Sequence, residues 1–302
     1  MTPAQEQEAF DMIWDGLTTQ SKARPTSSPK GFVLGGQPGA GKSKMVSRLG
    51  AELNRNLLVI NGDEFRRYHP NFDEIQARYG RDAPQHTAAF SSKMTEMVLD
   101  RALREKYNVS IEGTFRTAEV PMGTLDKMRL HGYETAVHIL TTPSEVSWQS
   151  TLERYNNMVE VGEQPRHTDK AHHDMVANRL AENADTVFAS GKADSFKVYT
   201  RDGLVFDDKI HKTMPGASID IELHRNSRQL EHLEVQYQKN AHRLSDSQKF
   251  IAKEAKRIIA ELNPADQVQA KISLYSSQLA ELNQKPPSQS PPSPSEEPEI
   301  ER

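Results

Sequence analysis

Nine residues near the start of the chain, GGQPGAGKS at positions 35–43, constrain the fold more than any other part of the sequence. They follow the apolar run 32–34 and precede a stretch with helical periodicity. Glycines allow backbone N–H groups to converge on phosphate oxygens, and a helix that begins near Lys42 adds the positive end of its dipole. The spacing Gly36-x-x-x-x-Gly41-Lys42-Ser43 therefore predicts a phosphate-binding loop (P-loop) for a nucleoside triphosphate, ATP or GTP.

The residues predicted to contact the nucleotide are those of the loop itself: Gly36, Gln37, Pro38, Gly39, Ala40, Gly41, Lys42 and Ser43. Lys42 is expected to reach the β- and γ-phosphates, and the Ser43 hydroxyl to bind Mg²⁺. The loop alone leaves the reaction open, because ATPase motors, GTPase switches and small kinases all use it.

Short apolar runs alternate with helical stretches between residues 31 and about 210. The runs that predict strands are 32–34, 57–60, 109–111 and 135–140. The stretches that predict helices are 42–54, 85–107, 119–131, 144–160 and 168–183. This alternation implies right-handed crossovers and a parallel sheet, and residues 197–206 add a hairpin through Asp202-Gly203. The predicted fold class is α/β, a P-loop NTPase-type parallel sheet flanked by helices.

The predicted domain organisation has four parts. Residues 1–30 contain a helix with apolar residues at a spacing of three to four, followed by a Pro/Ser linker. Residues 31–215 form the P-loop domain, and residues 216–284 form a C-terminal helical extension. Residues 285–302 are rich in Pro, Ser and Glu, and are predicted to be a disordered tail.

A seven-residue repeat marks the helical extension, at Leu230, Tyr237, Leu244, Ile251 and Ile258. It predicts a long helix that stops at Asn263-Pro264, followed by a shorter helix in an antiparallel hairpin. The second seam of the repeat includes polar residues, which is poor for a dimeric coiled coil. Two interpretations remain: packing within the chain, or a surface for self-association or for an inhibitory module.

Composition narrows the class of protein. A chain of 302 residues with a net charge of −4 has no global attraction to nucleic acid or to anionic lipid. No apolar run approaches the roughly 18 residues of a membrane span, and the acidic N-terminus lacks the apolar core of a signal peptide. The absence of cysteine excludes disulfides and thiolate metal sites. We therefore expect a cytoplasmic protein without nucleic-acid or membrane partners.

Two further loops are predicted to line the same crevice, because loops after parallel strands meet at the carboxyl edge of the sheet. Asp63 follows the second strand, where a carboxylate receives a proton from a substrate hydroxyl; the alternative is a helix N-cap. Glu112 and Thr114 follow the third strand, where they offer a carboxylate and a hydroxyl to a sugar; the alternative is a solvated turn.

Three segments together resemble the zeta toxin family of P-loop kinases, the toxin half of epsilon/zeta toxin–antitoxin systems. They are GGQPGAGKS, NGDEFRRYHPNF and IEGTFR, in this order. Arg154 in TLERYNNM, Arg166 in QPRHTDKAHHD and the VYTRDG hairpin support the resemblance, which covers residues 31–208. It implies an ATP-dependent UDP-N-acetylglucosamine kinase that phosphorylates the 3′-hydroxyl of the amino sugar and so blocks the use of a cell-wall precursor.

The resemblance also implies roles for individual residues. Asp63 matches the catalytic base, and Arg154 and Arg166 match two arginines that close on the phosphates together with Lys42. The residues expected to bind the acceptor substrate are Glu96, Glu112, Thr114 and Arg116. Arginine suits such a lid because its planar fork fits phosphate oxygens. Without the resemblance, the favoured interpretation is that Arg154 is a surface residue of a charged helix and pairs with Glu153 or Glu160.

Other interpretations stay open. The acceptor of a zeta-like kinase is set by its loops, so another small molecule, such as a dinucleotide, is one alternative. A nucleotide-binding regulatory protein that works through the C-terminal helices is a second. Members of the family are normally silenced by a small helical antitoxin, so an antitoxin is an expected partner. The histidines at 167, 172 and 173 are expected on a solvated helix rather than at a metal site.

Overall fold

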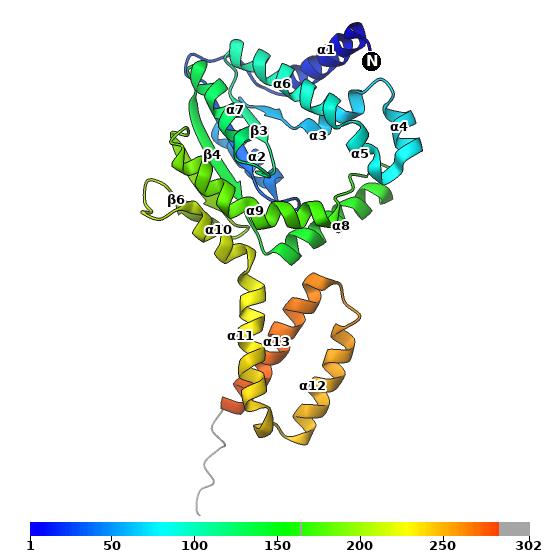
Figure 1. Cartoon of the computed structure of the whole chain (residues 1–302), viewed down its shortest axis with the longest axis vertical. Coiled ribbons are helices and arrows are strands. Elements are labelled where there is room, and N and C mark those ends of the chain that lie inside the picture. The colour runs from blue at the N-terminus through cyan, green and yellow to red at the C-terminus, as the bar shows by residue number, and fades with distance from the viewer. Residues whose placement is uncertain (164, 284–302) are drawn as a thin grey trace, which may run out of the picture. The chain divides into compact units, whose positions relative to one another are not determined.

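The computed structural model describes residues 1–163 and 165–283, so the predicted tail at 285–302 lies outside the described residues. The chain divides into two units, and the first is Met1–Arg225 (Figure 1). The second begins at Asn226. The predicted boundaries at residues 30 and 215 do not coincide with these limits, for reasons given below. Among the described residues, no helix has both the length and the hydrophobicity that crossing a bilayer requires.

A six-stranded sheet forms the centre of the first unit, with the order β2-β3-β1-β4-β5-β6. The strands are β1 (Lys30–Gly35), β2 (Leu58–Ile60), β3 (Val109–Glu112), β4 (Glu134–Leu140), β5 (Ser195–Tyr199) and β6 (Leu204–Asp207). All neighbouring pairs are parallel except β5 and β6, which form the predicted hairpin. The predicted α/β fold with a mainly parallel sheet is confirmed.

The helices of the first unit lie between the strands in the sequence, except that the first precedes β1 and the last follows β6. They are α1 (Pro3–Gln20), α2 (Lys42–Glu52), α3 (Gly62–Phe65), α4 (Phe72–Tyr79), α5 (Ala83–His86), α6 (Ala88–Arg104), α7 (Glu119–Leu130), α8 (Ser144–Glu160), α9 (Lys170–Ala189) and α10 (Pro215–Leu223). Short 3₁₀ turns lie at Arg66–Tyr68 and Gly80–Asp82. Each helix predicted between residues 42 and 183 has a counterpart, although 85–107 is divided at Thr87 into α5 and α6.

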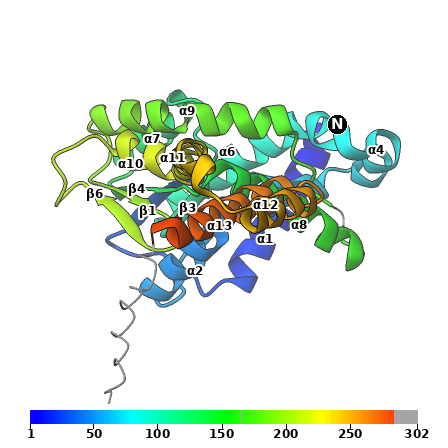
Figure 2. The same ribbon diagram turned by 90° about the horizontal axis from the view of Figure 1, so that it is seen from below.

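The two faces of the sheet have different coverings, because successive side chains of a strand point to opposite faces. Val33 and Val137 lie on the face covered by α1, α6, α7, α9 and α10. Leu34 lies on the other face and packs with Met45 and Leu49 of α2. Figure 2 shows α2 on one side of the strands and α7 and α9 on the other. This three-layer arrangement leaves the carboxyl edge of the sheet to the loops.

The N-terminal helix α1 belongs to the first unit rather than standing apart from it. Thr2 and Gln5 form a capping box that starts the helix. Phe10, Ile13 and Trp14 are buried, and the Trp14 ring meets the Tyr107 ring edge to face at 5.8 Å. At the other end of the unit, α10 packs on α9. These contacts make the unit larger than the predicted 31–215 domain.

Up to residue 283, where the described part of the second unit ends, the chain forms three α-helices instead of the predicted two: α11 (Arg225–Asn240), α12 (Asp246–Ile259) and α13 (Pro264–Asn283). The expected long helix is wrong, because the chain breaks at Ala241–Ser245. Ser245 Oγ accepts from the Gln248 N–H at 3.2 Å and Gln248 Oε1 accepts from the Ser245 N–H at 2.9 Å, which is a capping box. The break rotates the repeat out of the interior, so Ile251 and Ile258 are exposed.

Candidate active site

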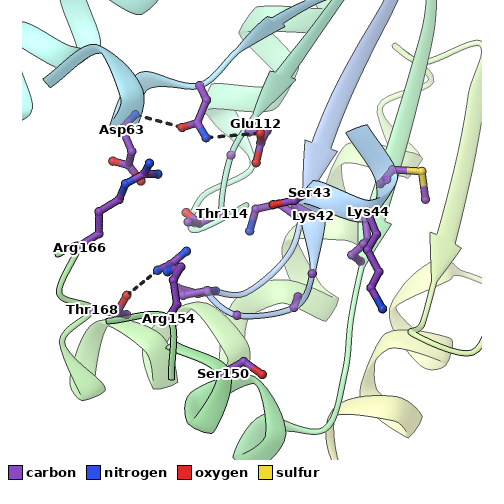
Figure 3. A pocket seen from close by; sticks show the side chains of 18 of the residues that line it. Lys42, Ser43, Lys44, Asp63, Glu112, Thr114, Ser150, Arg154, Arg166 and Thr168 are labelled. Atoms are coloured by element: carbon purple, nitrogen blue, oxygen red, sulfur yellow. Dashed lines mark hydrogen bonds between the residues drawn. The ribbon is translucent and has the colours of Figure 1, made fainter. Parts of the chain in front are cut away.

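A cavity of about 1310 Å³ lies at the carboxyl edge of the sheet. Its walls come from the P-loop after β1 and from the loops after β2 and β3. Helix α8, the segment before α9 and the β5–β6 turn complete it. Parallel strands end at the same edge, so residues far apart in the sequence meet there. Figure 3 shows Asp63, Glu112, Thr114, Arg154 and Arg166 around the space in front of Lys42 and Ser43.

The P-loop is folded closely against α8. Gly39 has φ +79°, and a Cβ atom there would lie 2.0 Å from the Ser147 backbone oxygen, so only glycine fits. The Lys42 ammonium donates to the backbone oxygens of Gly36, at 2.8 Å, and Gln37, at 3.3 Å. The loop therefore curls around the ammonium group, with Ser43 facing the cavity at the start of α2.

Lys42 has a perturbed titration. Burial lowers the pKa of its ammonium group to about 8, although the nearby Glu112 carboxylate opposes this shift. Burial also raises the pKa of the Glu112 carboxyl, and Lys42 opposes that shift in turn. A lysine and a carboxyl with such shifts in one cleft are typical of a functional site.

The Asp63 carboxylate does not cap a helix, so the N-cap role that the sequence left open for Asp63 is wrong. Asn61 is the N-cap of α3, since its Oδ1 accepts from the Asp63 N–H at 3.1 Å. The Asp63 carboxylate instead accepts from Arg66 Nε at 3.0 Å. Arg66 is held in turn by the Pro84 backbone oxygen and by Thr87 Oγ1. Asp63 thus lines the cavity with a fixed arginine beside it.

Asn61 also links the second and third loops. Its Nδ2 donates to Glu112 Oε1 at 3.4 Å while its Oδ1 caps α3 (Figure 3). Glu112 is the last residue of β3, and Thr114 follows it into the cavity wall. The structure therefore brings Asp63, Glu112 and Thr114 to one end of the cavity.

The two predicted lid arginines both line the cavity, although they come from different segments. Arg154 is on α8, and its Nη2 donates to Thr168 Oγ1 at 3.4 Å. Burial and the nearby Arg166 lower the pKa of the Arg154 guanidinium. Arg166 forms an ion pair with Glu64, the neighbour of Asp63. Arg154 is consequently not the surface partner of a glutamate on its own helix.

The four predicted acceptor-binding residues divide into two groups. Glu112, Thr114 and Arg116 line the cavity. Glu96 does not, because its position on α6 turns it toward Lys127 of α7, with which it forms an ion pair. The structure therefore does not bring Glu96 together with the other three.

Several residues of the site were not predicted from the sequence. Three of them are Asn61, Glu64 and Arg66, and the only feature of the sequence that could have indicated them is that they lie within three residues of Asp63. Arg201, in the β5–β6 turn, donates through Nη2 to the Gly39 backbone oxygen at 3.0 Å and to Ser150 Oγ at 2.7 Å. It ties the hairpin to the P-loop and to α8, a contact that no local pattern encodes.

The histidine cluster is only partly solvated, which corrects the sequence-based expectation for one member. His173 is fully buried, with its Nε2 2.8 Å from Ser147 Oγ and its Nδ1 3.0 Å from Asp174 Oδ1. Burial lowers the pKa of the His173 imidazole. Across residues 1–163 and 165–283, no group of three or more His, Asp or Glu side chains is arranged to hold a metal ion.

Comparison with known proteins agrees with this geometry. The sequence model of the family described as "Zeta toxin" matches residues 15–211. Toxin zeta of Streptococcus pyogenes is 36% identical over 199 residues, which are 65% of this chain and 67% of that protein. Toxin PezT of Streptococcus pneumoniae serotype 4 is 35% identical over 192 residues, 63% of this chain and 76% of that protein.

A solved structure has a similar fold. It comes from a study of the PezAT chromosomal toxin–antitoxin system of Streptococcus pneumoniae and has a TM-score of 0.66 at 29% identity. The match covers 74% of this chain and 88% of the other. The family match spans the sheet and the lid helices α8 and α9 that surround the cavity. The chain therefore belongs to the zeta toxin family.

Proposed function

We propose that this protein is a kinase that transfers the γ-phosphate of ATP or GTP to the 3′-hydroxyl of UDP-N-acetylglucosamine. The proposal rests on one observation: a single cavity is lined by the P-loop lysine Lys42, by the Asp63 carboxylate and by two arginines from separate segments. The Asp63 carboxylate does not cap a helix, since Asn61 is the N-cap of α3. Phosphoryl transfer depends mainly on positioning and on neutralising charge, and these are the groups it needs. Such a reaction would block the use of a cell-wall precursor.

Each group has a distinct task in the proposed reaction. Lys42 leaves the carbonyls of its own loop and binds the β- and γ-phosphate oxygens. Arg154 and Arg166 neutralise the charge on the equatorial oxygens of the transferred group. Asp63 orients the acceptor hydroxyl and takes its proton as the oxygen attacks phosphorus.

The acceptor would lie between the second and third loops. Glu112 and Thr114 present a carboxylate and a hydroxyl to the sugar, and Arg116 lies on the same wall. The cavity of about 1310 Å³ exceeds the 300–1,000 Å³ of ordinary ligand sites, as two substrates bound together require. Glu96 is left out of this set because the described structure pairs it with Lys127.

A divalent cation fits this site as a companion of the nucleotide. Mg²⁺ prefers oxygen ligands and binds through one or two protein groups plus phosphates and water. The Ser43 hydroxyl at the start of α2 supplies such an oxygen beside the phosphate positions. When bound, the ion would neutralise negative charge on the phosphates of the nucleotide.

An antitoxin is the proposed protein partner. The structural relative belongs to a toxin–antitoxin system by its own description, and this chain shares its fold over most of its length. An inhibitor of a kinase of this kind needs only to fill the open cavity, which lies at the surface of the first unit.

The test is an acceptor screen read by mass spectrometry. Purified protein is incubated with ATP or GTP, Mg²⁺ and UDP-N-acetylglucosamine, a panel of other sugar nucleotides, or a dinucleotide. We expect UDP-N-acetylglucosamine to gain the mass of one phosphate. Phosphorylation of another acceptor alone would refute the substrate, and no transfer to any acceptor would favour a nucleotide-binding regulatory protein.

Asp63→Asn is the matched negative variant of the screen, and Asp100→Asn is its control. Asp100 pairs with Lys127 outside the cavity, so its loss leaves the site intact. Removing a general base costs about 10²–10⁴-fold in rate. We therefore expect Asp63→Asn to bind nucleotide normally while transfer falls by that factor. Full activity in Asp63→Asn would remove Asp63 from the mechanism.

A further inference from the structure

The loop that follows β3 has an unusual backbone. Phe115 has φ +55°, in the left-handed region that residues with a bulky side chain rarely adopt. It is also buried, with 3% of its surface exposed. Such a conformation persists only when the surroundings enforce it, and it is often associated with a functional site. Phe115 lies between Thr114 and Arg116, which both line the cavity.

Three separate contacts hold this loop in place. The Gly113 N–H donates to the Leu34 backbone oxygen at 2.8 Å, which extends the β1–β3 pairing by one residue. Asn183 Nδ2 of α9 donates to the Phe115 backbone oxygen at 2.8 Å. The Phe115 ring lies on the backbone of Gly35.

The contact with Gly35 is too close for any other residue. A Cβ atom at Gly35 would lie 2.4 Å from Phe115 Cδ2 and 2.5 Å from Ile139 Cδ1, well inside van der Waals contact. Gly35 is the last residue of β1, immediately before the P-loop residue Gly36. The buried ring therefore connects the loop that carries Thr114 to the chain that enters the P-loop.

From this arrangement we propose that Phe115 and Asn183 are positioning residues that set the acceptor loop at a fixed distance from the P-loop. Asn183 holds the Phe115 carbonyl, the strained backbone turns the ring onto Gly35, and Thr114 and Arg116 are thereby aimed into the cavity. Neither Phe115 nor Asn183 lines the cavity itself, so both act through their neighbours. The inference rests on the proposed function, in which this loop binds the acceptor.

The variants are chosen to break one anchor at a time. Asn183→Ala removes the hydrogen bond, and the nearly isosteric Asn183→Asp replaces the donor by a carboxylate that repels the Phe115 carbonyl. Asn178→Ala is the control, since Asn178 is an exposed residue of the same helix. Phe115→Leu keeps an apolar side chain but loses the flat ring that fits over Gly35.

The first readout separates the two substrates. We expect the KM for UDP-N-acetylglucosamine to rise about 3–10-fold in Asn183→Ala, the range that the loss of one hydrogen bond produces, and further in Asn183→Asp. The KM for ATP should stay within about twofold, and Asn178→Ala should match the wild type. Equal changes in both KM values, or none, would mean that Asn183 has only a structural role and would overturn the inference.

The second readout is hydrogen exchange of the ligand-free protein, which requires no activity. The Gly113 amide should exchange faster in Asn183→Ala and Phe115→Leu than in the wild type or in Asn178→Ala. Unchanged protection would show that these residues do not anchor the loop. If the wild-type protein phosphorylates no acceptor, the proposed function is wrong. If the wild type is active and the Asn183 and Phe115 variants behave like it, the proposed function stands and only the positioning role is wrong.

Discussion

Replacing Lys42 by methionine is expected to stabilise the nucleotide-free protein while it abolishes nucleotide binding. The Lys42 ammonium lies among the carbonyls of its own loop, and burial lowers its pKa from 10.5 to about 8. A change of one pKa unit corresponds to about 1.4 kcal/mol, so the charged group costs the folded state about 3 kcal/mol. Methionine has a similar length and no charge.

The expected gain is smaller than this full cost. Lys42 as a residue is only half-buried, and water that reaches the ammonium reduces the penalty. The backbone carbonyls of Gly36 and Gln37, which are buried residues, also lose their donor, and this offsets part of the gain. We therefore expect the free energy of unfolding to rise by about 1–2 kcal/mol, which raises the unfolding midpoint by about 2–4 °C per kcal/mol.

The sign of the pH dependence follows from the direction of the shift. Below pH 8, Lys42 is charged in both the folded and the unfolded chain, so the whole cost is present. Between pH 8 and 10.5 the folded protein loses this proton first, and the cost is progressively relieved. The stability difference between Lys42→Met and the wild type should be largest near pH 7 and should narrow toward pH 10.

Thermal unfolding without nucleotide, at pH 7 and pH 10, measures both effects. Lys44→Met is the control, because Lys44 is an exposed lysine of the same helix and its replacement removes the same charge from the surface. Added ATP should raise the midpoint of the wild type and of Lys44→Met but not of Lys42→Met. A Lys42→Met protein that is less stable than the wild type, or a difference that does not depend on pH, would refute the reasoning.

Three further predictions concern the lid, the N-terminal helix and a buried histidine. Arg166→Lys should lower kcat by about 10³-fold in a phosphotransfer assay, because lysine lacks the planar guanidinium that fits phosphate oxygens. A kcat within tenfold of the wild-type value would contradict a role for Arg166 in phosphate binding. Trp14→Ala should cost about 3–5 kcal/mol in denaturant unfolding, since the Trp14 ring is buried in the main core; a loss below 1 kcal/mol would show that α1 is dispensable. Burial lowers the pKa of His138 to about 4, so the unfolded chain takes up this proton first and stability should fall by about 3 kcal/mol from pH 6.5 to pH 4. His138→Leu should lose less stability over the same interval, and equal acid sensitivity would exclude His138 as a cause.

Local sequence patterns were sufficient for the framework of the first unit. The glycine spacing around Lys42 predicted a P-loop, because left-handed backbone at Gly39 and Gly41 is a property of the residues themselves. The apolar runs predicted the strands for a similar reason: β-branched residues in short runs between turns favour extended backbone over a few residues. Both the glycine spacing and the apolar runs depend on residues that are close together in the sequence, so a local pattern can detect them.

Local patterns also misled where two of them competed. The seven-residue repeat from Leu230 to Ile258 predicted an unbroken helix, but the Ser245–Gln248 capping box starts a new one. Both signals were present in the sequence, and the cap prevailed because it satisfies backbone donors at a helix start. At Asp63, likewise, the sequence left two roles open, a proton-accepting carboxylate and a helix N-cap, and the folded chain uses Asn61 as the N-cap instead.

The site itself was decided by tertiary structure. Arg166 reaches Glu64 across 102 residues of sequence, Arg201 reaches Gly39 across 162, and Asn183 reaches Phe115 across 68. Such contacts depend on how helices pack on the sheet, which a side chain's own neighbours do not specify. The glycine spacing and the apolar run before it were enough to predict a triphosphate-binding loop after the first strand of a parallel sheet. Which charged side chains face the loop depends on how α8, α9 and the β5–β6 turn pack around it. Glu96 does not face the loop, because α6 turns it toward Lys127. The rotation of a helix about its axis is set by the core that the helix covers, and a local sequence pattern does not specify that rotation.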